Sequence, residues 1–297
     1  MHSNGAFRAL RRREALWALA FLAPSLAGFL IFTLFPVAAS LALSATRWDL
    51  IGRPTFVALS NYRDVLRDPL FWRVMANTLY YSAGVIPLVI VTSLALALAL
   101  NGPIRGRTLF RTLFFMPVIS STVAVAMVWR WIYAPFGVVN SLLTTMGLPA
   151  LGWLTTPTWA MPAVILMSTW QSMGYSMVIF MAGLQGIPRH LYDAAAVDGA
   201  TGWCRFWHIT LPLLSPTTFF VLVMALIRSF QVFGQVYMLT GGGPAYATST
   251  IVFYVYEEAF LSLHMGYASA LAWVLFGVVF FLTLIQLRFQ REWVTYD

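Results

Sequence analysis

The chain has 297 residues, of which 60% are hydrophobic and only 9% are charged. A soluble globular domain carries about 25% charged residues, so this composition excludes a soluble fold and indicates a polytopic membrane protein. The formal net charge of +8 would also suit a nucleic-acid-binding protein. The arginines lie at the ends of apolar segments, however, where membrane topology accounts for them, and we expect no nucleic-acid partner.

The intervals without charged residues are long enough for six membrane spans. A hydrocarbon core of ~30 Å needs ~20 apolar residues per helix. The expected fold class is therefore all-α, with six transmembrane helices. The first apolar run, from Ala15 to Ala45, is longer than the roughly 7–15 apolar residues of a secretory signal and has no clear cleavage site, so we expect it to remain as a span. The six spans are predicted at approximately 15–43, 76–100, 110–132, 158–183, 213–238 and 267–288.

Six spans place both termini on one side of the membrane. Arginines in the N-terminal arm, in the turn at 101–111 and in the tail favour the cytoplasm for that side, although five arginines between residues 47 and 73 weaken the argument. We expect a bacterial plasma (inner) membrane protein with a cytoplasmic arm at 1–13, a transmembrane domain at 14–290 and a cytoplasmic tail at 291–297.

No lysine occurs in the chain, and Cys204 is the only cysteine. A phosphate-binding loop of the type G-x-x-x-x-G-K-[ST] is therefore excluded, and any ATP hydrolysis must come from another subunit. A single cysteine forms no disulfide framework and no thiolate metal cluster. The four histidines, at 2, 190, 208 and 264, show no ligand spacing, so we expect no catalytic residue, metal site or cofactor in this chain.

A polar stretch, residues 186–212, separates the fourth and fifth predicted spans. Pro188 suits the first turn of a helix, and Gly199 is expected to end that helix because glycine adopts positive φ without penalty. One face is predicted to hold Leu191, Ala194, Ala195 and Asp198, at i, i+3, i+4 and i+7. The alanines leave this face thin, so a partner surface could approach the backbone closely; an ordinary interfacial helix is the alternative.

Two predicted spans carry clusters of polar side chains. Such residues usually face the interior of a helix bundle, and amides, hydroxyls and aromatic rings suit a polyhydroxy solute. Arg228 is costly in a span, at ~2.5–3.5 kcal/mol, so it needs water, a counter-charge or a ligand. We interpret the clusters as a solute path; helix–helix hydrogen bonding in span four, and snorkelling of Arg228 toward an interface, are the alternatives. The candidate residues are Ser168, Gln171, Ser172 and Tyr175 in span four, and Arg228, Ser229, Gln231 and Gln235 in span five.

The polar stretch resembles the EAA signature of binding-protein-dependent ABC importer permeases. The matching pattern is Asp193-Ala194-Ala195, three residues, Gly199, nine residues, then Ile209-x-Leu211-Pro212, with Asp in place of the usual Glu. Three further segments are similar to the carbohydrate branch of this family, which includes the larger maltose-transporter permease and the glycerol-phosphate permeases. These segments are RTLFFMP at 111–117, LQGIP at 184–188 and LTGGGP at 239–244.

The resemblance implies a type I ABC importer permease, which is not itself an enzyme. Such a permease pairs with a second permease, usually a different chain, and with two cytoplasmic ATPase subunits that bind ATP and Mg. An extracytoplasmic binding protein delivers the small polar solute, which could be a sugar, a sugar alcohol or a glycerol phosphodiester. The implied ATPase-coupling residues are Asp193, Ala194, Ala195, Asp198, Gly199, Ile209, Leu211 and Pro212.

Two other membrane functions compete with this interpretation. An ion-coupled secondary carrier commonly uses an intramembrane carboxylate, whereas we expect all ten acidic residues in loops or tails. An intramembrane enzyme would need a catalytic motif, and neither H-E-x-x-H nor G-x-S-x-G occurs.

Overall fold

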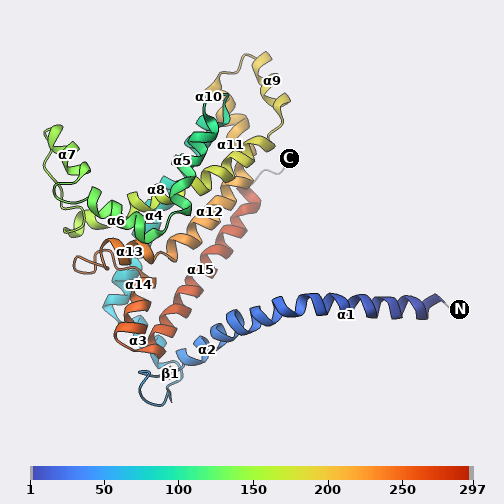
Figure 1. The fold of residues 1–297 in the computed structure, drawn as a ribbon, viewed down its shortest axis with the longest axis vertical. Coiled ribbons are helices and arrows are strands. Elements are labelled where there is room, and N and C mark those ends of the chain that lie inside the picture. The colour runs from blue at the N-terminus through green and yellow to red at the C-terminus, as the bar shows by residue number, and fades with distance from the viewer. Residues whose placement is uncertain (1–2, 294–297) are drawn as a thin grey trace. The chain divides into compact units, whose positions relative to one another are not determined.

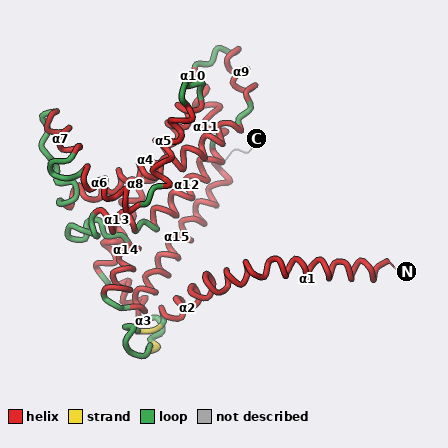
Figure 2. Tube along the Cα trace, in the orientation of Figure 1, coloured by secondary structure: helices red, strands yellow, loops and turns green. Residues whose placement is uncertain are grey.

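Helices make up nearly all of the secondary structure in residues 3–293, which are the residues that the computed structural model describes (Figures 1 and 2). The chain divides into two compact units. One contains Met1–Val65 and Glu258–Trp273, and the other contains Leu66–Glu257 and Val274–Asp297. Each unit is described by itself.

Within the described residues, four helical segments are long and apolar enough to cross a membrane. They are Leu16–Ser44, Pro69–Asn101, Pro157–Gly186 and Met265–Gln290. Two bent helix pairs raise the number to six if each pair is one span: Arg107–Ile119 with Thr122–Ile132, bent by 101°, and Gly202–Leu213 with Ser215–Phe230, bent by 65°. If each pair is one span, the number of candidate spans is the six that the sequence predicts.

The first unit begins with the helices of the first span. A π-helical turn, η1 (Leu30–Leu34), joins α1 (Ser3–Phe29) to α2 (Phe35–Ser44). Pro36 has no N–H for the helical ladder, and a widened turn is a common adjustment beside such an interruption. A two-stranded antiparallel hairpin follows, in which β1 (Thr46–Arg47) pairs with β2 (Thr55–Phe56).

Asn61 fixes this hairpin to the end of α2. It lies in α3 (Ser60–Arg67), and its buried side-chain amide donates to the carbonyls of Ser44 and Thr46, both at 2.8 Å. The backbone of α15 (Met265–Trp293) also approaches here, because a Cβ at Gly266 would collide with the Thr46 carbonyl. The hairpin is thus held in place by the buried amide of Asn61 and by the absence of a Cβ at Gly266.

The second unit is built around α4 (Pro69–Asn101) and α8 (Pro157–Gly186), which pack along each other. The Ser93 hydroxyl donates to the Met173 carbonyl at 2.9 Å, which ties the two helices together. Glycines allow close packing on other sides of α8: a Cβ at Gly174 would meet the Phe114 carbonyl, and one at Gly183 would meet Thr217. Small residues at such contacts are typical of membrane helix packing.

The third predicted span, 110–132, is not one straight helix. It consists of α5 (Arg107–Ile119) and α6 (Thr122–Ile132), with the 101° bend between them. Ser120 is extended, and its hydroxyl donates to the Met116 carbonyl at 2.9 Å. That bond occupies a helix acceptor, which favours a helix end. At ~1.5 Å per residue, α5 alone is too short for a ~30 Å hydrocarbon core.

The fifth predicted span, 213–238, is also interrupted. Its main helix α12 (Ser215–Phe230) ends before Gln231, and the short α13 (Gly234–Leu239) follows. A helical segment leads into α12 through the 65° bend, where Pro212 and Pro216 each remove a backbone donor. This segment consists of α10 (Gly202–Arg205), η2 (Phe206–Thr210) and α11 (Leu211–Leu213).

Short helices complete the described chain: α7 (Val138–Thr145), α9 (Arg189–Val197), α14 (Ile251–Tyr256) and η3 (Glu257–Leu261). Asn140 of α7 is buried and accepts from the Leu151 amide at 2.9 Å and from the Trp153 indole at 3.1 Å. The glycine-rich loop after α13 is held to α4, because Asn77 donates to the carbonyls of Tyr246 and Ser249.

The acidic residues differ in part from the sequence prediction. Six acidic residues lie in helices rather than in loops or tails: Glu14, Asp64, Asp193, Glu257, Glu258 and Glu292. Within residues 3–293, none of the candidate spans contains an acidic residue, so the expected lack of intramembrane carboxylates holds there.

Candidate functional site

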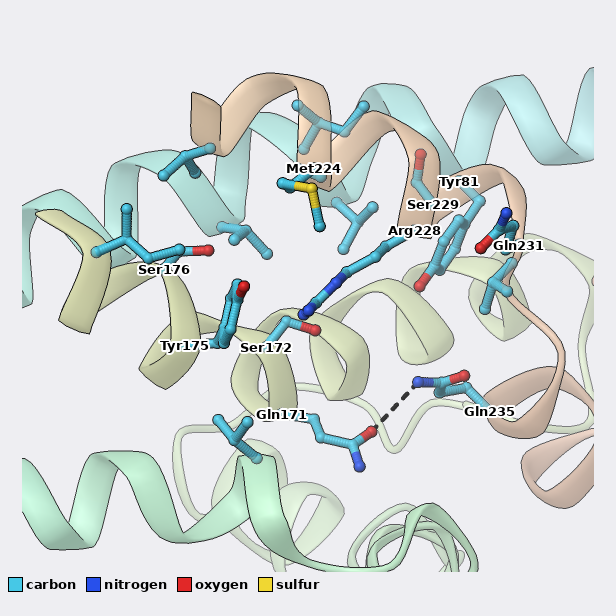
Figure 3. A pocket seen from close by; sticks show the side chains of 18 residues that line it. Tyr81, Gln171, Ser172, Tyr175, Ser176, Met224, Arg228, Ser229, Gln231 and Gln235 are labelled. Atoms are coloured by element: carbon cyan, nitrogen blue, oxygen red, sulfur yellow. Dashed lines mark hydrogen bonds between the residues drawn. The ribbon is translucent and has the colours of Figure 1, made fainter. Parts of the chain in front are cut away.

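A cavity of about 330 Å³ lies between α4, α8 and α12 and extends to the break after α12 (Figure 3). Its volume is within the ~300–1,000 Å³ range of typical ligand pockets. Apolar side chains such as Val85, Val89 and Met224 form part of the wall. The polar lining consists of Tyr81, Gln171, Ser172, Tyr175, Ser176, Arg228, Ser229, Gln231 and Gln235.

Seven of the eight residues predicted for the solute path line this cavity; Ser168 does not. Ser168 shares a helical face with Gln171 but lies one turn earlier, where α8 is packed into the core, and it is 1% exposed. Periodicity identifies a face of a helix but not where along that face a cavity ends. Ser168 therefore lies outside this cavity, and its assignment to the solute path stays a prediction.

Two polar lining residues were missed by the sequence interpretation. Tyr81 is a polar side chain within the second span, and Ser176 follows Tyr175 in the fourth. A polar side chain within a predicted span is the signal that marks the lining of spans four and five, and Tyr81 carries the same signal in span two.

Arg228 reaches into the cavity from the last turn of α12 (Figure 3). Its guanidinium carbon lies 4.1 Å from the centroid of the Tyr175 ring, which is a cation–π contact. Among residues 3–293, Arg228 forms neither an ion pair nor a hydrogen bond through its side chain. The position at a helix C-terminus favours a cation even without a carboxylate. Arg228 thus points into the cavity, which the snorkelling alternative did not anticipate.

A chain of amide hydrogen bonds crosses one end of the cavity. The Gln235 amide donates to the Gln171 side-chain oxygen at 3.3 Å (Figure 3), and the Gln171 amide donates to the Thr122 hydroxyl at 3.3 Å. These bonds connect α13, α8 and α6. Helix–helix hydrogen bonding, the alternative considered for span four, is therefore present at Gln171, which also lines the cavity.

The break between α12 and α13 lies at the cavity wall, because Gln231, Val232 and Gln235 all line it. In membrane proteins, irregular backbone within a span is tolerated where it lines a cavity or is buried in protein. Interrupted helices with free backbone groups are also a recurring feature of solute sites in transporters.

The polar stretch 186–212 forms α9 and the turn that ends it. Gly199 has φ of 74°, the Gly199 amide donates to the Ala196 carbonyl at 3.1 Å, and the Ala200 amide donates to the Ala195 carbonyl at 2.8 Å. This is a Schellman motif, which satisfies carbonyls at the helix end. Pro188 differs from the prediction: it is extended and precedes the helix as its N-cap residue.

The predicted coupling residues occupy two different environments. Asp193, Ala194, Asp198 and Gly199 are exposed and Ala195 is half-buried. By contrast, Ile209, Leu211 and Pro212 are half-buried in η2 and α11, where they lead into α12. The second group is therefore placed to hold α9 on the bundle rather than to extend its exposed surface.

The exposed surface of α9 also includes an apolar residue that the sequence interpretation did not single out. Val197 is 89% exposed at the end of the helix. The Tyr192 and Thr210 hydroxyls lie 3.0 Å apart and join α9 to η2. The exposed residue Cys204 lies between these elements, in α10.

Comparisons with known proteins agree with this arrangement. Residues 89–294 match the family described as the binding-protein-dependent transport system inner membrane component. The chain is 40% identical over 291 residues to the probable ABC transporter permease protein YesP of Bacillus subtilis (strain 168), covering 96% of this chain and 94% of that protein. It is 36% identical over 281 residues to the lactose transport system permease protein LacF of Rhizobium radiobacter, covering 92% and 93%.

A solved structure has the same fold. A chain of the bacterial alginate ABC transporter, in complex with alginate pentasaccharide-bound periplasmic protein, superposes with a TM-score of 0.83 at 26% identity, covering 96% of this chain and 97% of that chain. This likeness confirms the predicted importer-permease fold and does not favour an ion-coupled carrier. ATP hydrolysis in such importers belongs to separate subunits, so the chain is not an enzyme.

The family match covers most of the chain, and the relatives match it almost from end to end. The chain therefore belongs to the binding-protein-dependent transport system inner membrane components and is a multi-pass permease subunit of an ATP-binding-cassette importer.

Proposed function

We propose that this permease carries a saccharide or a related polyhydroxy solute through the cavity between α4, α8 and α12. The observation that carries the proposal is the lining, which combines two tyrosines with amide and hydroxyl side chains. Amides and hydroxyls both donate and accept hydrogen bonds, as sugar hydroxyls do. The named solutes of two similar proteins, lactose and alginate, are both saccharides, which supports this class.

We propose that α9 is the coupling helix and that its exposed surface contacts a cytoplasmic ATPase subunit. Asp193, Ala194, Asp198 and Gly199 are exposed on it, and the short alanine side chains leave its backbone accessible. The permease would have two packing arrangements. The two ATPases, when they close on ATP and Mg, would bind one arrangement more tightly than the other and so shift the permease toward it.

A second permease, different from this chain, is proposed to complete the path. Both termini are proposed to lie in the cytoplasm. With six spans, residues 186–212 lie on the same side as the termini, and the arginines at 105, 107 and 111 lie on that side as well. This arrangement is the one that the positive-inside rule favours. The external side would then receive the solute-binding protein.

Uptake by the assembled importer in proteoliposomes tests the proposed function. A thermal-shift screen of the binding protein against neutral and acidic saccharides would first select the labelled solute. We expect uptake to require ATP and the binding protein. Uptake driven by an ion gradient in the absence of ATP, or no uptake of any saccharide that the binding protein holds, would contradict the proposal.

Ser172→Ala tests whether the cavity is the path. A lost neutral hydrogen bond of about 0.5–1.5 kcal/mol corresponds to a roughly 2- to 10-fold loss of apparent affinity. Ser141→Ala is the matched control, because Ser141 is exposed on α7, outside the cavity. Equal uptake by the two variants would argue against solute contact at Ser172.

A further inference from the structure

We propose that the transported solute carries a carboxylate, and that Arg228 is the side chain that recognises it. The proposal rests on the proposed function, since it concerns the same cavity, and it narrows the solute from saccharides in general to acidic saccharides.

The lining of the cavity carries positive charge and no negative charge. Arg228 is the one charged residue among the 18 that line the cavity. No acidic residue occurs in any candidate span of the described chain. The guanidinium brings one positive charge and N–H donors but no acceptor. The Arg228 side chain is exposed to the cavity, so water solvates it when no solute is bound. A neutral solute that displaces this water would leave the charge without a partner, whereas a carboxylate would balance it.

The contact with Tyr175 positions the guanidinium for such a solute. At 4.1 Å from the ring centroid, the cation is held by the ring face. Within the described residues its N–H groups make no hydrogen bond. Arginine presents its N–H groups as a planar fork, which matches the two oxygens of a carboxylate.

Neighbouring side chains would complete the recognition of an acidic sugar. Ser172 lies beside the end of the guanidinium and Ser229 lies next to Arg228 in α12 (Figure 3). The Ser172 hydroxyl can donate to a carboxylate, and Gln231 can bond sugar hydroxyls. The Ser229 hydroxyl already donates to the Leu226 carbonyl at 2.8 Å, which leaves its oxygen to accept from a sugar hydroxyl. This set provides donors around one acidic group and mixed donors and acceptors for the rest of the solute.

A carboxylate fits the cavity better than a phosphate monoester. A phosphate monoester carries about −1.5 to −2 charge at neutral pH. With one cation in the lining, a phosphate would retain roughly one unbalanced charge, whereas a carboxylate would retain none.

The test compares two disaccharides that differ at one position of one sugar. Galacturonosyl-galactose carries a single carboxylate where the neutral digalactose of the same linkage carries a hydroxymethyl group. Binding of each to the assembled permease and ATPase complex, without its binding protein, would be measured in nanodiscs by saturation-transfer NMR. The measured quantity is the ratio of the two dissociation constants, and sn-glycerol-3-phosphate is a third probe.

We expect the wild-type complex to bind galacturonosyl-galactose about 10- to 100-fold more tightly than the neutral disaccharide, as for a charge-assisted hydrogen bond. Arg228→Gln should bring this ratio close to one, because glutamine carries no charge. Arg228→Lys keeps a charge but loses the fork, so its ratio should be intermediate. Arg130→Gln is the matched control: Arg130 is exposed on α6 and does not line the cavity, so the ratio should not change.

Three results would overturn the proposal. The first is equal weakening of both disaccharides by Arg228→Gln, which would indicate a structural role or a counter-charge on the companion permease. The second is a wild type that does not prefer the acidic disaccharide, and the third is a wild type that prefers the phosphate probe. In each case saccharide transport itself would still stand, whereas binding of none of the three probes would count against the proposed function as well. If Arg228→Gln does not assemble, an unchanged ratio in Arg228→Lys would overturn the role of the guanidinium.

Discussion

Replacing Gly199 separates backbone strain from steric obstruction at the end of α9. The residue has φ of 74°, and apart from Gly199 itself and its two chain neighbours no residue has an atom within 4 Å of the position that a Cβ would take. Gly199→Ala therefore adds only the cost of a left-handed conformation, about 1–2 kcal/mol. Asparagine adopts this conformation more readily than alanine, so Gly199→Asn should cost less.

Gly199→Trp adds bulk that this chain can accommodate. If α9 is the coupling helix, the indole would collide with the ATPase surface rather than with the permease. We expect the ATPase to copurify with Gly199→Asn as it does with the wild type, and not at all with Gly199→Trp. For Gly199→Ala we expect the affinity for the ATPase to fall by up to about 5- to 30-fold. Copurification in detergent, followed by ATP hydrolysis stimulated by the binding protein, measures both steps.

Gly147 provides a matched control. It follows α7 with φ of 77° and equally open surroundings, so Gly147→Trp imposes the same strain and the same bulk at a different helix end. This variant should copurify with the ATPase like the wild type. If Gly199→Trp and Gly147→Trp both retained the ATPase and transported solute, α9 would not be the coupling surface.

Close packing, buried hydrogen bonding and the amide chain each allow a further test. Gly174→Ala places a Cβ against the Phe114 carbonyl, and the overpacking should destabilise the protein by about 1–3 kcal/mol, seen as a lower melting temperature in detergent; an unchanged melt would contradict this contact. Asn61→Leu leaves two carbonyls without their donor, and a loss of about 1–3 kcal/mol is expected in the same assay, with unaltered unfolding as the refuting result. Gln235→Leu breaks the 3.3 Å bond to Gln171, and we expect a roughly 2- to 10-fold change in the apparent affinity for solute uptake; identical uptake would show that the bond is dispensable.

The spans were predictable because hydrophobic length and charge placement are properties of the sequence itself. The first and fourth, predicted at 15–43 and 158–183, correspond to Leu16–Ser44 and Pro157–Gly186. The bends were not predictable in this way. A hydropathy pattern does not report the direction of a helix axis. The 101° turn between α5 and α6 depends on an extended Ser120 and on the hydrogen bond from its hydroxyl to the Met116 carbonyl.

The candidate site was predictable in its chemistry but not in its limits. Polar residues in spans four and five marked helix faces that line the cavity, and the break after α12 brings Gln231 and Gln235 to the same cavity as Arg228. The position of Ser168 outside the lining, and of Tyr81 within it, depends on how α4 packs on α8. Sequence spacing contains no information on that contact.

The exposed thiol of Cys204 makes the natural chain suitable for distance measurements in a working importer. It lies in α10, between α9 and α12, and it is the only cysteine of the sequence. A spin label or fluorophore attached there would occupy one known position per permease without the removal of any other thiol. Because the chain also contains no lysine, amine-reactive dyes would react with its N-terminal amine alone, so two different probes could be placed by chemistry on this chain before it is assembled with its partners.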